Sequence, residues 1–180
     1  MKFTELALPG VFRVDLEPLL DERGTFARTF CAREFAARGL AAAFVQTNLS
    51  ETRARGTLRG LHFQRAPHGE AKVVRCVRGR IHDVLVDLRP ESPARGRHVA
   101  LVLSAREKHA VYAPAGVAHG FLTLEDDCEV HYLMSEFYAP DCASGVRWND
   151  PAFGIEWPEP VRVISERDRT WPDYDFGRSH

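Results

Sequence analysis

Three polar side chains stand inside apolar, strand-like segments where packing alone would not place them. Residues 58–64 (LRGLHFQ) carry Arg59 and His62, and residues 114–121 (PAGVAHGF) carry His119. Two imidazoles on two apolar strands indicate a polar site inside a β-barrel. Such a site, lined by a base, an acid and a cation, is suited to proton transfer.

Strand parity decides which of these side chains share a surface, because successive residues face opposite sides. His62 shares a face with Gly60 and Gln64, which makes a poor core surface and a good cavity lining. A lone histidine on a strand is also compatible with a purely structural role. Arg59 has the opposite parity, so it reaches the same cavity as His62 only if the strand twists or bulges between them.

A tyrosine and a lysine are further candidates. Tyr132 shares a strand face with Val130 and Met134, which predicts that it points into the barrel. The same pattern fits a core tyrosine whose hydroxyl bonds to the backbone. Lys72 opens an apolar strand, a position more typical of a solvated lysine at a strand end.

The elements that must position these residues are short strands separated by Gly, Pro and Asp. Such a series is typical of an all-β sandwich or barrel. The expected strands after residue 57 are 58–64, 72–77, 81–88, 99–103, 111–113, 121–124 and 129–135. One short N-terminal helix is expected over residues 32–38, closed by Gly39. The Pro- and Trp-rich residues 148–176 are expected to wrap the surface of the barrel.

Composition limits the classes of function. The 180 residues contain no linker, which predicts one domain over residues 1–180. A formal net charge of −1 gives no attraction to nucleic acid or to a membrane, although a few local cations suffice for an anionic small molecule. The N-terminus lacks the apolar segment of a signal peptide and no run is long enough to span a membrane, so a cytoplasmic protein is expected.

Known cofactor motifs are missing, and the candidate metal ligands are few. Residues 114–119 resemble the second half of a cupin signature, whose first half in metal-binding cupins supplies His-x-His and a glutamate. Here His62 and Gln64 occupy the two histidine positions of His-x-His, and Glu70 lies farther on, so one imidazole is missing. Transition metals usually need three or more protein ligands, and no metal is expected. The four cysteines have no zinc-binding spacing, and no dinucleotide, P-loop or hydrolase motif occurs, so no cofactor is expected.

In this setting the sequence resembles the dTDP-4-dehydrorhamnose 3,5-epimerase family, metal-free cupins that epimerise nucleotide-linked 4-keto-6-deoxy sugars. The matching segments follow family order and include 21–24 (DERG), 44–48 (FVQTN), 58–64, 72–76 (KVVRC), 83–89 (DVLVDLR), 91–93 (ESP), 114–121, 132, 138–140 (YAP), 148–150 (WND), 154–158 (GIEWP) and 165–168 (SERD). The resemblance implies a cupin-type jelly-roll β-sandwich and an epimerase.

The resemblance also implies roles for the cavity residues. A ketone at C4 acidifies the hydrogens on C3 and C5, because the resulting carbanion is an enolate. His62 is similar to the family's general base, and Asp168 to the carboxylate that orients it. Tyr132 matches the acid that returns a proton from the opposite face, and Lys72 the cation that steadies the enolate oxygen.

Other positions match residues that bind the substrate in the family. The resemblance implies that the pocket is lined by Arg59 and His119 and that the nucleotide end is contacted by Arg23, Arg28, Gln46, Asn48 and Tyr138. Tyr138 matches the aromatic residue that stacks on the base. The resemblance further implies a homodimer in which the N-terminal strands pair across a twofold axis and Arg23 reaches the neighbour's site.

Two departures from the family pattern concern the nucleotide end. Arg28 stands where relatives hold an acidic residue, and residues 141–145 (DCASG) lack the glutamate usual after the Tyr-x-Pro turn. An arginine cannot accept the N3–H of thymine, so a cytosine nucleotide is one alternative. The other is that Arg28 turns to solvent or to a phosphate and thymine remains bound.

The sequence leaves the carbons inverted and the downstream deoxysugar route open. The leading hypothesis is an epimerase acting on C3 and/or C5 of a nucleoside-diphosphate 4-keto-6-deoxyhexose. An epimerase that inverts one centre only is an alternative, and a non-catalytic sugar-binding cupin is another. A metal-dependent cupin would need ligands that the sequence does not offer.

Overall fold

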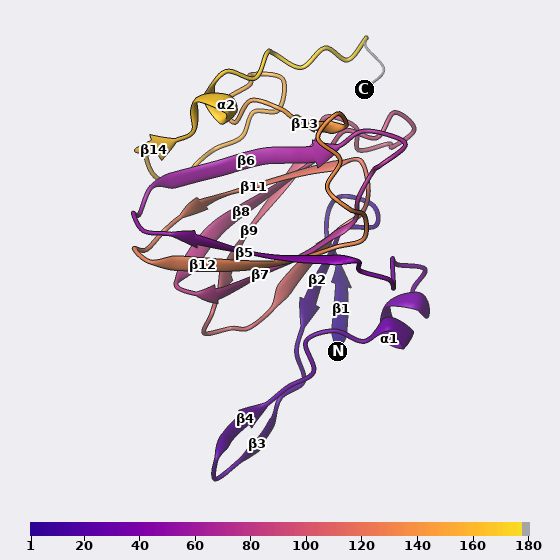
Figure 1. Ribbon diagram of the computed structural model, residues 1–180, viewed down its shortest axis with the longest axis vertical. Coiled ribbons are helices and arrows are strands. Elements are labelled where there is room, and N and C mark those ends of the chain that lie inside the picture. Colours follow the sequence, from indigo (N-terminus) through magenta and orange to yellow (C-terminus); the bar gives the residue numbers. More distant parts are fainter. Residues whose placement is uncertain (178–180) are drawn as a thin grey trace.

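Two antiparallel sheets packed face to face form the body of the protein in the computed structural model, which describes residues 1–177 (Figure 1). The first sheet has the order β1 (Lys2–Glu5), β2 (Phe12–Asp15), β10 (Ala110–Ala113), β7 (Lys72–Arg78), β12 (Cys128–Met134) and β5 (Gln46–Thr52). The second has the order β13 (Ala143–Gly145), β6 (Thr57–Gln64), β11 (Val117–Thr123), β8 (Arg80–Asp87) and β9 (His98–Ser104), with β14 (Val163–Ile164) running parallel to β6. The all-β sandwich predicted from the sequence is confirmed.

The core between the sheets explains why these segments are strands. Several strands carry apolar residues on one face, and these meet the apolar residues of the facing sheet. The first sheet contributes Val74, Val111 and Val130, and the second contributes Leu85 and Phe121; each of these five is at most 1% exposed. Full burial of one such side chain typically stabilises a fold by about 1.5–3 kcal/mol.

Two helices and one strand differ from the sequence prediction. The helix α1 (Ala32–Ala36) ends before residue 38, because the following amides bond three residues back and the backbone turns left-handed at Gly39, with φ +70°. The second helix, α2 (Glu166–Arg169), lies in a stretch for which no helix was expected. The strand β11 begins at residue 117, four residues earlier than expected, so His119 lies within it.

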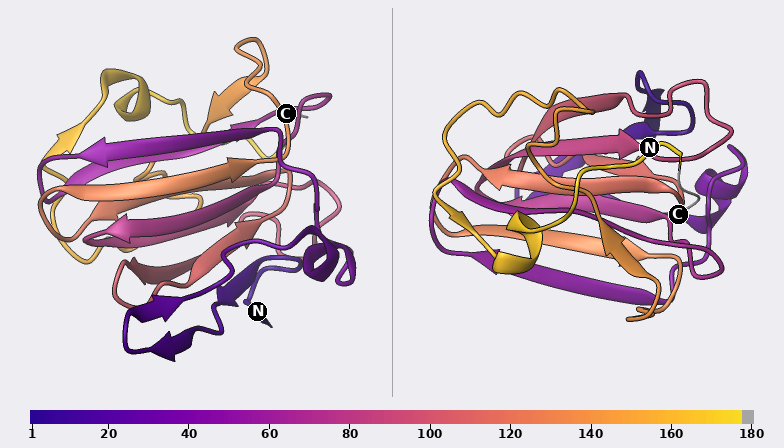
Figure 2. Two further views of the ribbon diagram at one scale, coloured as in Figure 1. Left: turned by 60° about the horizontal axis from the view of Figure 1, so that its bottom comes forward. Right: turned by 90° about the horizontal axis from the view of Figure 1, so that it is seen from above.

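The C-terminal segment packs on the outer face of the second sheet, as expected for a wrapping segment. Phe153 and Tyr174 pack with Leu61 and Val86 of that sheet, and Trp157 lies against the same cluster. Figure 2 shows this segment, in orange and yellow, crossing over the strands. The segment thereby brings β14 and α2 to the edge of β6.

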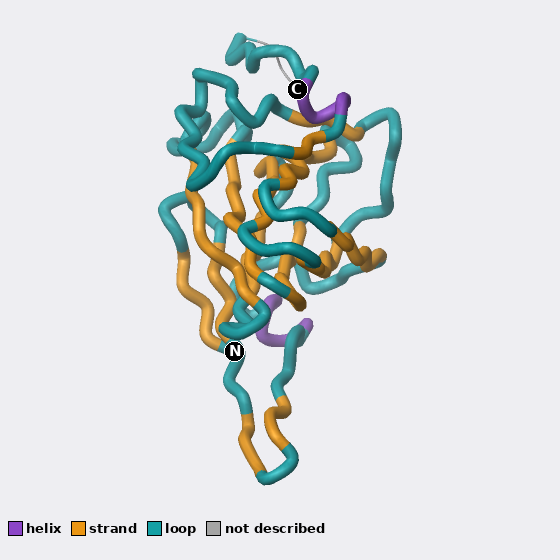
Figure 3. The backbone as a smooth tube through the Cα atoms, turned by 90° about the vertical axis from the view of Figure 1, so that its left-hand side faces the viewer, coloured by secondary structure: helices purple, strands orange, loops and turns teal. Residues whose placement is uncertain are grey.

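A small hairpin projects from the sandwich near the N-terminus. It consists of β3 (Leu19–Asp21) and β4 (Gly24–Phe26), and Figures 1 and 3 show it extending away from both sheets. Its apolar side chains are largely solvent-exposed: Leu19 is 71% exposed, Leu20 77% and Phe26 74%. In the part of the chain that the structure describes, none of the helices has the length and apolar character needed to cross a bilayer.

Candidate active site

A cavity of about 680 Å³ lies between the two sheets, and polar residues from both sheets line it. From the first sheet come side chains of β5, β7 and β12, and from the second come side chains of β6 and β11. The lining residues predicted from the sequence are Gln46, Asn48, Arg59, His62, Lys72, His119, Tyr132, Tyr138 and Asp168. The structure therefore brings together nine of the eleven predicted site residues.

A bulge in β6 allows Arg59 and His62 to face the same cavity. His62 lies opposite His119 on β11, whereas Arg59 lies opposite Phe121, so β6 carries one extra residue between the two pairs. This extra residue brings Arg59 and His62 to the same face of β6, although their spacing would put them on opposite faces of a regular strand. Gly60 sits in the bulge with φ +133°, and a Cβ atom there would lie 2.4 Å from the Cα of Gly120. Only glycine fits this position without displacing the neighbouring strand.

The imidazole of His62 is held by a carboxylate from the C-terminal segment. Its Nε2 lies 2.6 Å from Oδ1 of Asp168, and the backbone N–H of Gly60 donates to Oδ2 of the same carboxylate over 3.2 Å. Ser165 caps α2 by accepting the backbone N–H of Asp168, which fixes the carboxylate on the first turn. The His62 side chain remains 46% exposed, so it is accessible from the cavity, whereas that of Asp168 is 6% exposed.

The surroundings of Asp168 lower the pKa of its carboxyl group. Burial alone would raise the pKa of the Asp168 carboxyl. The hydrogen bond with His62, together with the backbone N–H of Gly60 and the hydroxyl of Ser165, outweighs burial and holds that pKa below its ordinary value. An ionised Asp168 keeps the proton of a neutral His62 on Nε2, so Nδ1 is left with a free lone pair.

Tyr132 reaches the cavity from β12, on the sheet facing β6. Burial, reinforced by the charge of Asp83, raises the pKa of its hydroxyl far above the ordinary value, so the hydroxyl keeps its proton. The ring packs against the core and stands edge-on to the imidazole of His119, with centroids 5.9 Å apart. Tyr132 thus has both properties that the sequence suggested: it belongs to the core and it lines the cavity.

His119 also has a carboxylate partner, which sequence reasoning missed. Its Nε2 lies 2.7 Å from Oδ2 of Asp83, a side chain of β8 that is fully buried. The signal was present, since an aspartate such as Asp83 is rarely fully buried and here it stands in the mostly apolar residues 81–88. The partnership itself depends on the pairing of β8 with β11, which the sequence does not specify.

Lys72 is buried, so the alternative of a solvated strand-end lysine is excluded. Its side chain is 7% exposed, pairs with the carboxylate of Glu70 and donates to the backbone oxygen of His62 over 3.1 Å. The chain before β7 brings Glu70 beside this strand end, where its carboxylate also accepts the backbone N–H of Gln64. Glu70, considered above only as a possible metal ligand, is the partner of this lysine.

The mouth of the cavity carries the residues expected at the nucleotide end. The Gln46 amide donates to Oδ1 of Asn48 over 3.1 Å and accepts the backbone N–H of Tyr138 over 3.2 Å. Tyr138 is 58% exposed, so its ring is accessible for stacking on a base. Glu136 and Arg167 also line the cavity and were not predicted.

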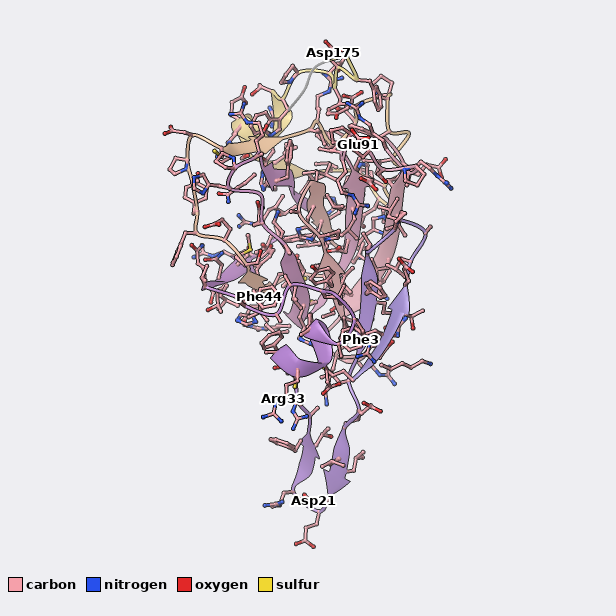
Figure 4. All side chains as sticks on the ribbon, turned by 90° about the vertical axis from the view of Figure 1, so that its right-hand side faces the viewer. Phe3, Asp21, Arg33, Phe44, Glu91 and Asp175 are labelled. Atoms are coloured by element: carbon pink, nitrogen blue, oxygen red, sulfur yellow. The ribbon has the colours of Figure 1, made fainter. Side chains whose placement is uncertain are left out.

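Two predicted site residues lie outside the cavity of their own chain. Arg23 is at the turn of the β3–β4 hairpin, where it donates to Asp21, and Figure 4 shows Asp21 at the far tip of that hairpin. Arg28 is exposed and lies 3.4 Å from Glu34. The expectation that Arg23 reaches a neighbouring subunit therefore stays a prediction.

The arrangement can carry out proton transfer next to a carbonyl group. The imidazole of His62 projects from one wall and the protonated hydroxyl of Tyr132 from the opposite wall, and the side chain of Lys72, at the start of β7, also lines the cavity. Within residues 1–177, no three or more His, Cys, Asp or Glu side chains are grouped to hold a metal ion.

Comparisons with known proteins match this chain over almost its whole length. The model of the family described as dTDP-4-dehydrorhamnose 3,5-epimerase matches residues 5–175. A curated dTDP-4-dehydrorhamnose 3,5-epimerase of Methanothermobacter thermautotrophicus is 44% identical over 174 residues, covering 94% of this chain and 92% of that protein.

Solved structures are similar over the same length. The dTDP-4-dehydrorhamnose 3,5-epimerase of Elizabethkingia anophelis has a TM-score of 0.94 at 36% identity, covering 97% of this chain and 96% of that one. The enzyme of Bacillus anthracis, solved with TDP and PPi bound, has a TM-score of 0.92 at 35% identity, covering 96% and 99%. The cupin-type jelly roll expected from the sequence is thereby confirmed.

Proposed function

The chain belongs to the dTDP-4-dehydrorhamnose 3,5-epimerase family, and on this premise we propose how its cavity carries out the reaction. The protein is an isomerase that acts on dTDP-4-keto-6-deoxy sugars. Removal of a proton from C3 or C5 gives an enolate, because the C4 ketone accepts the charge. Return of a proton to the opposite face then inverts the carbon. The reaction therefore needs a base and an acid on opposite sides of the sugar ring.

The observation that carries the proposal is that His62 and Tyr132 enter one cavity from facing sheets. His62 removes the proton through Nδ1, and the hydrogen bond between Nε2 and Asp168 stabilises the imidazolium that forms. Tyr132 returns a proton from the other side, since its raised pKa keeps the hydroxyl protonated. Each such group typically contributes about 10²- to 10⁴-fold to the rate.

Lys72 is proposed to stabilise the enolate oxygen. Its ammonium group lines the cavity and is fixed by two contacts, with Glu70 and with the backbone of His62. A preorganised donor aimed at a developing oxyanion typically contributes about 3–4 kcal/mol. Arg59 and His119 line the same pocket and are proposed to contact the sugar and its phosphates.

The thymine nucleotide is proposed to bind at the mouth, against Gln46, Asn48 and Tyr138. The contact of Arg28 with Glu34 supports the interpretation that Arg28 turns away from the base. A preference for dTDP over CDP is therefore expected, and Arg28→Glu should leave it unchanged. A preference for CDP, or a gain in dTDP affinity on that substitution, would support the alternative in which Arg28 alters base recognition.

The homodimer remains a proposal, supported by the exposed apolar side chains of the β3–β4 hairpin. In a twofold dimer this hairpin would lie against the partner and carry Arg23 toward the partner's cavity. The cytoplasmic location and the single domain over residues 1–180 also stay predictions.

Solvent deuterium incorporation tests the proposed function. Wild-type protein incubated in D₂O with dTDP-4-keto-6-deoxyglucose should place deuterium at C3 and C5 and form the 4-keto-rhamnose product. Exchange at one carbon only would identify a single-centre epimerase, and binding without exchange would identify a sugar-binding cupin. The proposed steps use only side chains of this chain, so exhaustive chelation should leave turnover unchanged. Loss of turnover that one divalent ion restores would overturn this expectation.

A further inference from the structure

A buried carboxylate connects the strand of the base with the strand of the cation. Glu70 is 4% exposed, and its Oε1 pairs with the ammonium of Lys72 on β7. Its Oε2 accepts the backbone N–H of Gln64 on β6 over 2.8 Å. Lys72 in turn donates to the backbone oxygen of His62, so both strands are held at one point.

A lysine in this position needs a partner to stay charged. Taking an ammonium group out of water disfavours its charged form, whereas an opposite charge in contact favours it. Burial lowers the pKa of Lys72, and the charge and hydrogen bond of Glu70 oppose that effect. A neutral amine would be a poor partner for an enolate oxygen, so the charge of Lys72 is a requirement of the chemistry.

We propose that Glu70 is a positioning residue for the epimerisation: its carboxylate keeps the Lys72 ammonium charged and aimed into the cavity while the enolate forms. This inference rests on the proposed function of Lys72. A merely structural Glu70 would stabilise the fold but would leave the pH dependence of catalysis unchanged.

Other charged groups in the cavity do not take this role. The titratable or charged side chains that line it besides Glu70 and Lys72 are Arg59, His62, His119, Glu136, Arg167 and Asp168, with two tyrosines, Tyr132 and Tyr138. Asp168 pairs with His62, and Glu136 accepts the backbone N–H of its neighbour Phe137. Among the residues that the structure describes, Glu70 is the carboxylate in ion-pair contact with Lys72.

The test is the pH profile of the Glu70→Gln variant. Glutamine keeps the shape and can still accept the Gln64 N–H, but it removes the charge. An opposite charge in contact typically changes a pKa by about 1–3 pH units, so the alkaline limb of kcat should move to lower pH by about that amount. At a pH above both limbs, kcat of the variant should be lower than that of the wild type by about tenfold for each pH unit by which the limb has moved. KM and the affinity for dTDP should stay close to the wild-type values.

Glu136→Gln is the matched control, because it removes another carboxylate of the cavity that does not touch Lys72. Its alkaline limb should coincide with that of the wild type. The inference is overturned if Glu70→Gln lowers thermal stability but keeps the wild-type limb, or if both variants move the limb equally. Absence of C3 and C5 exchange in the wild type would instead refute the proposed function.

A second variant keeps the test decisive if Glu70→Gln does not fold. Lys72→Arg retains a cation across the accessible pH range, because a guanidinium is not deprotonated in proteins. Its alkaline limb should disappear from the pH profile of deuterium exchange. If the limb stays at the wild-type pH, deprotonation of Lys72 does not cause it, and the proposed role of Glu70 is refuted.

Discussion

The imidazole of His62 meets two requirements that a general base must satisfy together. It is held in one orientation by Asp168 at 2.6 Å, yet almost half of its side chain remains accessible from the cavity. Burial of the carboxylate and exposure of the imidazole separate the two tasks. The carboxylate supplies orientation, and the open nitrogen supplies basicity.

Replacing His62 by asparagine should therefore abolish exchange while preserving the fold. Asparagine is close to imidazole in size and keeps a polar group near Asp168. Deuterium incorporation at C3 and C5 should fall about 10²- to 10⁴-fold, as for loss of a general base. Mass spectrometry of the recovered sugar measures the exchange, and dTDP binding with circular dichroism controls for folding. Exchange near the wild-type rate would assign His62 a structural role.

Tyr132→Phe should act differently, because it removes the donor and leaves the base. Abstraction by His62 and return of solvent deuterium to the same face can continue without the tyrosine hydroxyl. Exchange should therefore outlast net inversion in this variant. Comparing the deuterium content of the substrate with the amount of inverted product measures the difference. Equal loss of exchange and inversion would count against the assignment of Tyr132 as the acid.

The carboxyl of Asp168 also predicts how stability depends on pH. Its pKa is held below the ordinary value in the folded protein, so its contribution to stability is complete above the unfolded value of about 4. That contribution is lost as the pH falls through the folded pKa. Asp168→Asn should thus lower the free energy of unfolding at pH 7 and have a smaller effect near pH 3. Urea unfolding at the two pH values tests this, and an equal loss at both would contradict it.

The sequence predicted which side chains line the cavity, and Asp168 as the partner of His62, but not the partners of His119 and Lys72. His62, Tyr132 and Lys72 lie in segments whose pattern is specific, and all three line the cavity. Asp83 and Glu70 were not assigned as partners, because their pairing depends on which strands are neighbours and on how a loop folds back. Both are features of the tertiary structure, which strand parity does not predict.

At the scale of the elements, the bulge in β6 decides whether a site forms. Without the extra residue, Arg59 and His62 would face opposite sides of the sheet. The backbone at Gly60 has φ +133° and passes close to Gly120 of β11. The sequence could show that a twist or bulge was needed there, and the register of β6 with β11 supplies it.

Gly60→Ala should therefore destabilise the protein and reduce activity together. The positive φ typically costs about 1–3 kcal/mol for a non-glycine residue, and the contact with Gly120 adds a packing cost of similar size. Urea unfolding and the exchange rate measure the two effects. Gly39→Ala is the matched control, since Gly39 has φ +70° and a Cβ atom added there would have no neighbouring atom within 4 Å. An equal effect at both positions would show that the close strand contact is unimportant.

Element ends were the least predictable part of the fold. The strands β7 and β12 match their predicted ranges to within one residue at each end, because their apolar pattern is continuous. The start of β11 was placed too late, since Gly116 and Gly120 interrupt that pattern. The helix α2 is only four residues long, too short to produce a periodic signal, although its Ser165 cap and Asp168 hold the imidazole of His62.

At the scale of the whole molecule, the active site joins segments from across the chain. The two sheets supply opposite walls, and the C-terminal segment crosses the second sheet (Figure 2) and brings Asp168 to the imidazole of His62. The apolar contacts of Phe153 and Tyr174 with that sheet fix the path of this segment. The fold thus places the carboxylate by packing that lies outside the cavity.

The β3–β4 hairpin leads to a prediction about assembly. Leu19, Leu20 and Phe26 expose an apolar surface on an element that projects from the sandwich, which favours contact with a second copy (Figure 1). Light scattering should give a dimer for the wild type, and Leu20→Glu should shift it toward the monomer by placing a charge in the contact. A monomeric wild type would refute the proposal.

A complementation experiment decides whether Arg23 serves the partner's site. Arg23→Ala and His62→Asn should each be impaired alone, because one lacks a substrate contact and the other lacks the base. If Arg23 acts across the twofold axis, a hybrid dimer combines an intact His62 from one subunit with an intact Arg23 from the other. Mixing the two variants under exchange of subunits should then raise activity above that of either one. If Arg23 acted within its own chain, every site of the hybrid would keep one defect, and mixing would produce no gain.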